Sequence, residues 1–245
     1  MDITISEKAG VRYLHFGSSW IQGAMRIARP WSLELDYTRE MMACLLFRPE
    51  QYWPRRVLSI GLGAASLTKF LYRHRPEARQ TVVEINPQVV TVARQVFKLP
   101  DETARLRIVI NDGADFIIKS KTKFDLILVD GFDADARTGA LETQPFYFNC
   151  RDHLSKQGIL VVNLLSRSYR SSIYNMLNAF DDRVLSLPSL DDGNTIVFAT
   201  NGEPIRQSLD ELKAQAKLLK KETGLNLLPL LPGLAQSCAD GVLML

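Results

Sequence analysis

The 245-residue sequence lacks the features of a membrane, metal-binding or disulfide-stabilised protein. No apolar run approaches the ~18 residues that a membrane-spanning helix needs. The three cysteines do not have the spacing of metal ligands, and the three histidines lie far apart along the chain. An odd number of cysteines without a signal-peptide pattern indicates reduced thiols. We therefore expect a cytoplasmic protein with no metal site.

A strong excess of charge of one sign is also lacking. The formal net charge of +3 is too small to indicate a nucleic acid or an acidic membrane surface as partner. Hydrophobic residues make up 46% of the chain and charged residues 23%, as in an ordinary globular protein. The length fits one large domain, or one domain with a small appendage.

Alternating strand and helix patterns predict an α/β fold from residue 57 onward. Short, continuous apolar runs such as DLILVD and GILVVNLL are typical of strands covered by helices on both faces. Right-handed crossovers between such strands produce an open, doubly wound parallel sheet. The expected strands lie near 57–60, 80–85, 106–110, 125–130 and 159–164, with a terminal antiparallel hairpin at 183–187 and 194–199. The expected helices lie near 36–47, 65–74, 87–97, 114–120, 144–154 and 168–180.

Two further regions flank this predicted domain, which we place at residues 31–204. Residues 1–30 contain the short β patterns 3–6, 11–16 and 20–27, which predict a small antiparallel appendage. In the C-terminal region, 205–245, apolar residues repeat at helical spacing over 205–222, and Gly224 is a typical helix stop. We expect the apolar tail beyond it to pack on the core or on a second subunit.

The first expected strand of the sheet leads into the motif Gly61-Leu62-Gly63. Glycine lets the backbone turn sharply and approach a ligand closely. Glu84 ends the next strand 21 positions after Gly63, close to the ~20 expected for an acid that binds ribose hydroxyls. The third glycine of a dinucleotide fingerprint is missing, because Ser66 takes its place, and no Gly-Lys-Ser/Thr indicates a P-loop. The pattern favours a nucleoside site of the S-adenosylmethionine type.

Acidic residues also follow two later strands of the expected sheet. Asp112 can accept a hydrogen bond from an adenine amino group, and Gly113 lets the ring lie close. Alternatively, Asp112 caps the helix that follows, and both interpretations can hold together.

Asp130, Asp133 and Asp135 lie within six residues at the carboxyl end of a central strand, where ligands bind in such sheets. Clustered carboxylates raise one another's pKa, which suits a proton acceptor, and they attract a cationic substrate. The alternative is a solvated acidic loop.

Together, these motifs resemble the spermidine synthase family of polyamine aminopropyltransferases. From about Trp20 to Leu165, the glycine loop, VVEINP, NDGADF, LILVDGFD and QPFYFNCRDHLSKQGILVVNL have the order and spacing of that family. The resemblance implies a class I methyltransferase-like, Rossmann-like sheet with a small β N-terminal region, assembled as a homodimer. It also implies a donor substrate, decarboxylated S-adenosylmethionine or S-adenosylmethionine, and transfer of an aminopropyl group to a small-molecule amine without a metal.

The resemblance assigns roles to individual residues. Gly61 and Gly63 would form the loop around the donor, and Glu84 would hold its ribose. Asp112 and Gly113 would contact the adenine. Asp130 would be the catalytic base, and Asp133 would bind a substrate ammonium group.

Several positions depart from the family pattern on the amine side. Ala64 replaces an Asp that binds the free amine of the decarboxylated donor, and Asn163 replaces a Gln. Thr38 and Cys44 stand where the family has the Tyr and His that line its polyamine channel. These changes leave two alternatives open: an S-adenosylmethionine-dependent methyltransferase and a non-catalytic nucleoside-binding homologue. Retention of Glu84, Asp112 and Asp130 favours an enzyme over the non-catalytic homologue.

Overall fold

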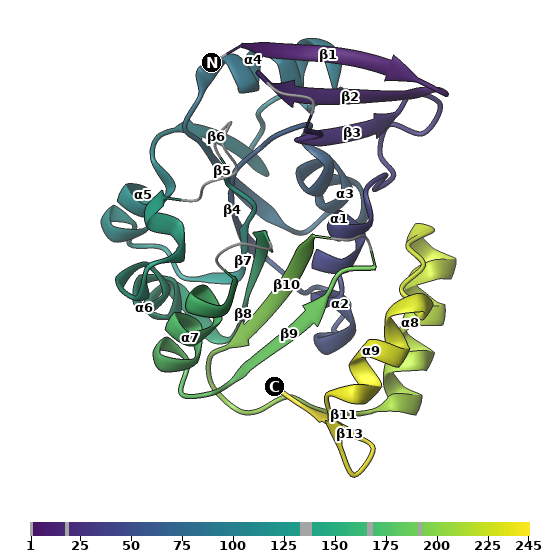
Figure 1. Cartoon of the computed structure of the whole chain (residues 1–245), viewed down its shortest axis with the longest axis vertical. Helices are drawn as coiled ribbons and strands as arrows, with labels where there is room; N and C mark the ends of the chain where they lie inside the picture. Colours follow the sequence, from purple (N-terminus) through teal and green to yellow (C-terminus); the bar gives the residue numbers. More distant parts are fainter. Residues whose placement is uncertain (1, 18–19, 133–138, 166–168, 191–192) are drawn as a thin grey trace.

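A computed structural model of the chain describes residues 2–17, 20–132, 139–165, 169–190 and 193–245. Its centre is a seven-stranded sheet with the order β6-β5-β4-β7-β8-β10-β9 (Figure 1). Neighbouring strands from β6 to β8 are parallel, whereas β10 runs antiparallel to both of its neighbours. The expected doubly wound sheet with a closing hairpin is therefore confirmed. The strands are β4 (Arg56–Ile60), β5 (Arg79–Glu84), β6 (Leu106–Ile110), β7 (Phe124–Val129), β8 (Leu154–Leu165), β9 (Val184–Pro188) and β10 (Asn194–Thr200).

Helices cover both faces of the sheet because successive strand residues point to opposite sides. In β7, Leu126 and Leu128 pack on one face, while Ile127 and Val129 pack on the other. The second face is covered by α5 (Gly113–Lys119), α6 (Gln144–His153) and α7 (Tyr169–Ala179), with the short 3₁₀ helix η1 (Gly139–Glu142) before α6. Helices α3 (Ser66–His74) and α4 (Pro87–Val96) follow β4 and β5.

The predicted helix at 36–47 is divided into α1 (Asp36–Met41) and α2 (Cys44–Phe47). Between them the chain makes a tight turn, in which Met42 and Ala43 donate backbone hydrogen bonds three residues back, to Arg39 and Glu40. The segment from Met41 to Phe47 is buried on every side, so tertiary packing rather than an amphipathic pattern determines its path.

The N-terminal strands β1 (Ile3–Lys8), β2 (Val11–Phe16) and β3 (Gly23–Arg26) form a separate antiparallel sheet. The third strand is shorter than the predicted 20–27. Gly23 lies directly against the loop after β4, since a Cβ atom added to it would be 2.6 Å from the Cβ of Ala64. The small sheet therefore covers part of the glycine loop.

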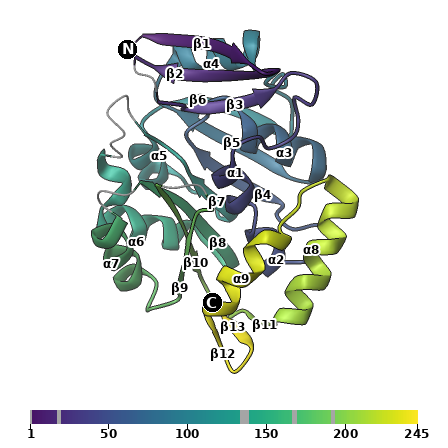
Figure 2. The same cartoon turned by 45° about the vertical axis from the view of Figure 1, so that its right-hand side comes forward.

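The C-terminal helix α8 (Leu209–Thr223) begins four residues later than the predicted 205. Residues Arg206–Ser208 instead form β11, which pairs with β13 (Val242–Met244), and β13 pairs with β12 (Cys238–Ala239). The 3₁₀ helix η2 (Leu228–Leu230) and α9 (Leu231–Gln236) connect them. Figure 2 shows α8 and α9 beside α2, and tail leucines share a buried cluster with the central strands. None of the described helices is long and apolar enough to cross a membrane.

Candidate active site

The parallel sheet brings the described site residues together at the carboxyl ends of its strands. Strands β5, β4 and β7 are neighbours, so the loops that follow them meet at their carboxyl ends. Backbone hydrogen bonds fix these loops to one another: Gly61 donates to the Val83 carbonyl and Asp130 donates to the Ile60 carbonyl, both at 2.9 Å. The glycine loop is thus held between the two acidic strand ends.

Gly61 is required by this arrangement. Its φ is +93°, and an added Cβ atom would lie 2.2 Å from the backbone oxygen of Asp130. Gly63 also has a positive φ, +50°, and an added Cβ atom would lie 3.3 Å from the backbone oxygen of Gln22. These backbone-to-backbone contacts join the glycine loop to the start of the Asp130 loop, while the close approach to a ligand stays a prediction.

Glu84 connects the ends of β4 and β5. Its Oε2 accepts a hydrogen bond from the Leu62 backbone and its Oε1 accepts one from the Asn86 backbone, each at 2.9 Å. Burial raises the pKa of this carboxyl, and the backbone hydrogen bonds oppose the shift. Each oxygen of a carboxylate has two lone pairs, so the same group retains acceptor capacity for a pair of hydroxyls.

Asp112 is the N-cap of α5. Its Oδ1 accepts hydrogen bonds from the backbone of Ala114 at 2.8 Å and Asp115 at 3.0 Å, so the capping interpretation is confirmed. Gly113 is buried beneath it, and an added Cβ atom would lie 2.3 Å from the Ile60 Cγ2. This glycine allows α5 to pack on β4, while the contact of both residues with adenine stays a prediction.

Asp130 lies at the carboxyl end of β7 and accepts hydrogen bonds on both carboxylate oxygens. The Tyr37 hydroxyl donates to Oδ2 at 3.2 Å, and the Asn163 amide donates to Oδ1 at 2.9 Å. Burial raises the pKa of Asp130, and these two hydrogen bonds act in the opposite direction. The pKa of Tyr37 is raised well above 10 by burial and by the Asp130 charge, so the phenol keeps its proton.

A further hydrogen bond holds the Asn163 side chain. Asn194, the first residue of β10, donates to the Asn163 Oδ1 at 2.7 Å. Asn163 of β8 thereby keeps its amide nitrogen directed at Asp130. The three side chains form a hydrogen-bonded chain that runs from β10 through β8 to the end of β7. The remaining acids of the motif, Asp133 and Asp135, lie outside the described residues.

The sequence interpretation missed Tyr37 and Asn194, and it noted Asn163 only as a replacement. Tyr37 precedes Asp130 by 93 residues and Asn194 follows Asn163 by 31, so no local pattern connects them. The sequence did offer one indication of these contacts, namely the position of polar residues at strand ends. Such residues become neighbours when the strands end at the same edge of the sheet. Among the described residues no cluster of His, Cys, Asp and Glu has an arrangement that fits a metal ion.

Comparison with known proteins connects this geometry with one family. Residues 35–183 match the spermine/spermidine synthase domain. The chain is 40% identical to a polyamine aminopropyltransferase of Neisseria meningitidis serogroup A over 96% of this chain and 90% of that protein. It is 39% identical to the corresponding enzyme of Chromobacterium violaceum over 91% of this chain and 85% of the relative.

Solved structures share the fold at lower identity. A probable spermidine synthase from Corynebacterium glutamicum superposes with a TM-score of 0.73, at 21% identity over 89% of this chain and 83% of that one. Human methyltransferase-like protein 13 in complex with SAH superposes with a TM-score of 0.69, at 23% identity over 78% of this chain and 93% of that one. Together with the sequence matches over nearly the whole chain, this fold shows that the protein belongs to the spermine/spermidine synthase family of transferases.

Proposed function

We propose that the protein transfers an aminopropyl group from a donor of the S-adenosylmethionine type to a small amine, with Asp130 as the base. The supporting observation is the position of Asp130, which is partly buried at the end of β7 beside the glycine loop and hydrogen-bonded on both oxygens. The names of the curated relatives support the same reaction.

The chemistry requires a base, because an alkylammonium group has a pKa near ~10 and its nitrogen is not nucleophilic while protonated. Asp130 takes the proton from the amine. The amine nitrogen then attacks the carbon next to the donor sulfonium, the carbon–sulfur bond breaks, and the bonding electrons neutralise the sulfur. The products are the alkylated amine and methylthioadenosine. Tyr37 and Asn163 hold the carboxylate in place for this step, and the bound donor is aligned with the nucleophile.

We assign the nucleoside of the donor to the loops around Glu84. In the proposal Glu84 binds the ribose hydroxyls, with Gly61 and Gly63 in the adjoining loop. Asp112 and Gly113 lie beside the adenine, where the second oxygen of Asp112 accepts from the amino group. Asp133 binds the ammonium group of the acceptor.

The second candidate function is that of a methyltransferase, and it differs from the first in the donor that the protein uses. Ala64 supplies no charge for a free ammonium group, and it is 2% exposed and packed against Gly23. A carboxylate introduced at position 64 would have to enter this contact between the loop and β3. The donor preference is therefore best measured on the unchanged protein, by incubation with each donor. Methylthioadenosine as product supports aminopropyl transfer, whereas S-adenosylhomocysteine supports methyl transfer.

The substitution Asp130→Asn tests the proposed base. We expect turnover to fall by roughly 10²–10⁴-fold, because the amide cannot accept the proton, while methylthioadenosine affinity stays nearly unchanged. The matched control is Asp115→Asn on α5, an exposed acid paired with Lys119, which should leave turnover unchanged. Equal losses in both variants would show a general effect of negative charge instead.

The proposal also includes the cellular and structural organisation expected from the sequence. It comprises a cytoplasmic homodimer with a nucleoside-binding domain at 31–204, the β region 1–30 and the C-terminal region 205–245. Sedimentation of the pure protein measures the oligomeric state directly, since a dimer has twice the 27.6 kDa mass of the chain.

A further inference from the structure

A cavity of about 500 Å³ lies between the α1 region, the β9–β10 hairpin and the C-terminal tail. Its walls come from residues 26–40, from Leu190 and from residues 224–230. This volume is within the range of pockets that hold small ligands. Neither Asp130 nor Tyr37 is among the described residues that line it, so the cavity is separate from the candidate active site.

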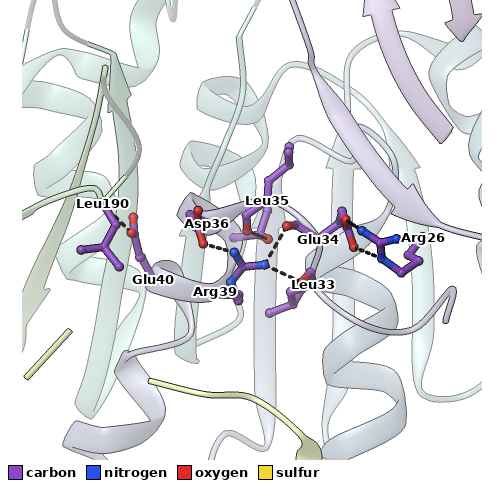
Figure 3. A network of polar contacts seen from close by, with 9 residues as sticks. Arg26, Leu33, Glu34, Leu35, Asp36, Arg39, Glu40 and Leu190 are labelled. Carbon is purple, nitrogen blue, oxygen red and sulfur yellow. Dashed lines mark hydrogen bonds and ion pairs between the residues drawn. The ribbon is translucent and has the colours of Figure 1, made fainter. Parts of the chain in front are cut away.

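Six charged side chains line this cavity: Arg26, Arg29, Glu34, Asp36, Arg39 and Glu40. Four of them form two ion pairs. Arg26 pairs with Glu34 through its Nε at 3.0 Å and through a second contact. Arg39 pairs with Asp36 and also donates to the backbone oxygens of Leu33 and Glu34, at 3.0 and 2.6 Å. Figure 3 shows both pairs: Arg26 with Glu34 before α1, and Arg39 with Asp36 within its first turns. Their hydrogen bonds leave no net charge for a ligand.

Glu40 is the first of the two charged groups that remain. It is 1% exposed, and its Oε1 accepts a hydrogen bond from the Leu190 backbone at 2.8 Å (Figure 3). Its Oε2 is buried and has no hydrogen-bond partner in the described part of the chain. A buried carboxylate oxygen without a partner is costly, and an ammonium group is the partner that compensates it best. The unpaired oxygen therefore points to a cationic ligand group.

Arg29 is the second remaining group, and it lies on the exposed side of the same cavity. In the described ranges its guanidinium takes part in no hydrogen bond or ion pair, although its backbone bonds to Arg26 and Ser32. A guanidinium binds carboxylates and phosphates through paired hydrogen bonds. The cavity thus has an unpaired anion at a buried wall and an unpaired cation at an exposed one.

We propose that this cavity binds a small molecule that has a primary ammonium group at one end and an anionic group at the other. The ammonium group binds Glu40 and the anionic group binds Arg29. A diamine is a poorer ligand, because its second ammonium group would face Arg29. The site does not depend on the proposed transfer reaction, since its binding requires no nucleoside donor.

Calorimetric titration with three amino acids of increasing length tests the site: glycine, 4-aminobutanoate and 6-aminohexanoate. We expect at least one to bind the wild-type chain, and the corresponding simple alkylamine and alkanoate to bind at least tenfold more weakly. Glu40→Gln and Arg29→Gln should each weaken binding at least tenfold. The amide at position 40 keeps an acceptor for the Leu190 backbone, and Arg29 is exposed, so the second variant tests the site even if the first fails to fold.

Matched controls separate this site from other charges and from the active site. Glu77→Gln and Arg79→Gln change exposed residues outside the cavity and should bind as the wild type does. Asp130→Asn should also retain full affinity for the amino acid. The proposal is wrong if none of the three amino acids binds, if the cavity variants bind normally, or if Asp130→Asn abolishes binding. It is also wrong if 1,4-diaminobutane binds more tightly than the amino acids and loses that affinity in Glu40→Gln.

Discussion

At the scale of single residues, Asn194 acts on Asp130 through Asn163. The side-chain amide of an asparagine can rotate by half a turn, which in Asn163 would direct the oxygen instead of the nitrogen toward Asp130. The hydrogen bond from Asn194 to the Asn163 Oδ1 opposes this rotation. Asn194 is therefore a positioning residue for the proposed base, and its effect should be visible in the pH dependence of the reaction.

We predict that Asn194→Ala moves the acidic limb of the kcat/KM profile to higher pH, because it weakens the hydrogen bond from Asn163 to Asp130. The hydrogen bond from Asn163 lowers the pKa of Asp130, so weakening it raises that pKa, and the base is then protonated at a higher pH. The profile is measured with the same amine for both proteins. The control is Asn149→Ala, whose side-chain amide donates to the Pro145 backbone oxygen within α6. A lower rate with an unshifted limb would assign Asn194 a purely structural role.

Glu84 supports a second prediction at this scale. Glu84→Ala should weaken methylthioadenosine binding by roughly 1.5–3 kcal/mol, the range for hydrogen bonds to a charged group. Calorimetric titration measures it, with the exposed Glu77→Ala as control. The substitution also leaves the backbone of Leu62 and Asn86 without their acceptor, so the melting temperature should fall as well. Unchanged affinity would contradict the placement of the ribose.

The residues of the site were predictable from the sequence to different degrees for a physical reason. Gly61 and Glu84 were found because strand–turn–helix geometry sets their separation, and in the structure the Leu62 amide between the glycines hydrogen-bonds to Glu84. Tyr37 was not found, because only the completed fold brings α1 to the end of β7. Local patterns thus identified the residues that we propose for the nucleoside, whereas the surroundings of Asp130 depend on contacts between distant segments.

At the scale of elements, Lys69 connects α3 with the end of α4. It is 1% exposed, and its Nζ donates to the backbone oxygen of Phe97 at 2.7 Å. Burial lowers the pKa of this amine to about 7. Between that value and the ordinary pKa of lysine, the unfolded chain binds one more proton than the folded chain. Stability should therefore rise with pH through this window.

We predict that the free energy of unfolding of the wild type increases from pH 7 to pH 9, by up to about 1.4 kcal/mol for each pH unit from this group. Lys69→Met should remove that part of the slope, because the variant has no proton to release. Urea unfolding at pH 7, 8 and 9 measures both proteins. The slope is the readout, since loss of the bond to Phe97 lowers stability equally at each pH. Parallel slopes for the two proteins would contradict the assignment.

The elements themselves were predicted best where a local signal marks their ends. Asn86 and Pro87 start α4, and Asp112 starts α5, so both helices begin within one residue of the prediction. The prediction was wrong at 205–208, which precedes α8 and contributes residues 206–208 to β11, because the partner strand β13 lies far along the chain. It was also wrong in treating 36–47 as a single helix, since burial on every side gives no periodic pattern to read.

At the scale of the whole molecule, the C-terminal tail and the central sheet share one core. Leu234 of α9 is 0% exposed and belongs to the same buried cluster as Val161 of β8 and Phe198 of β10. The terminal residue, Leu245, exchanges two backbone hydrogen bonds with Ile205. These contacts indicate that the tail and the sheet unfold together, so damage to the tail should destabilise the entire fold.

We predict that Leu234→Ala lowers the free energy of unfolding by about 2–5 kcal/mol, the cost of removing a large side chain from a packed core. Far-ultraviolet and near-ultraviolet circular dichroism should still report one coincident transition, shifted as a whole. The matched control is Leu218→Ala on α8, where the side chain is 46% exposed and the expected change is within ~0.5 kcal/mol. If a separate early transition appeared while the main one stayed at its wild-type position, the tail would be an independent unit. Because tail residues also line the cavity beside Glu40, a shared core would couple the stability of the whole fold to ligand binding at that cavity.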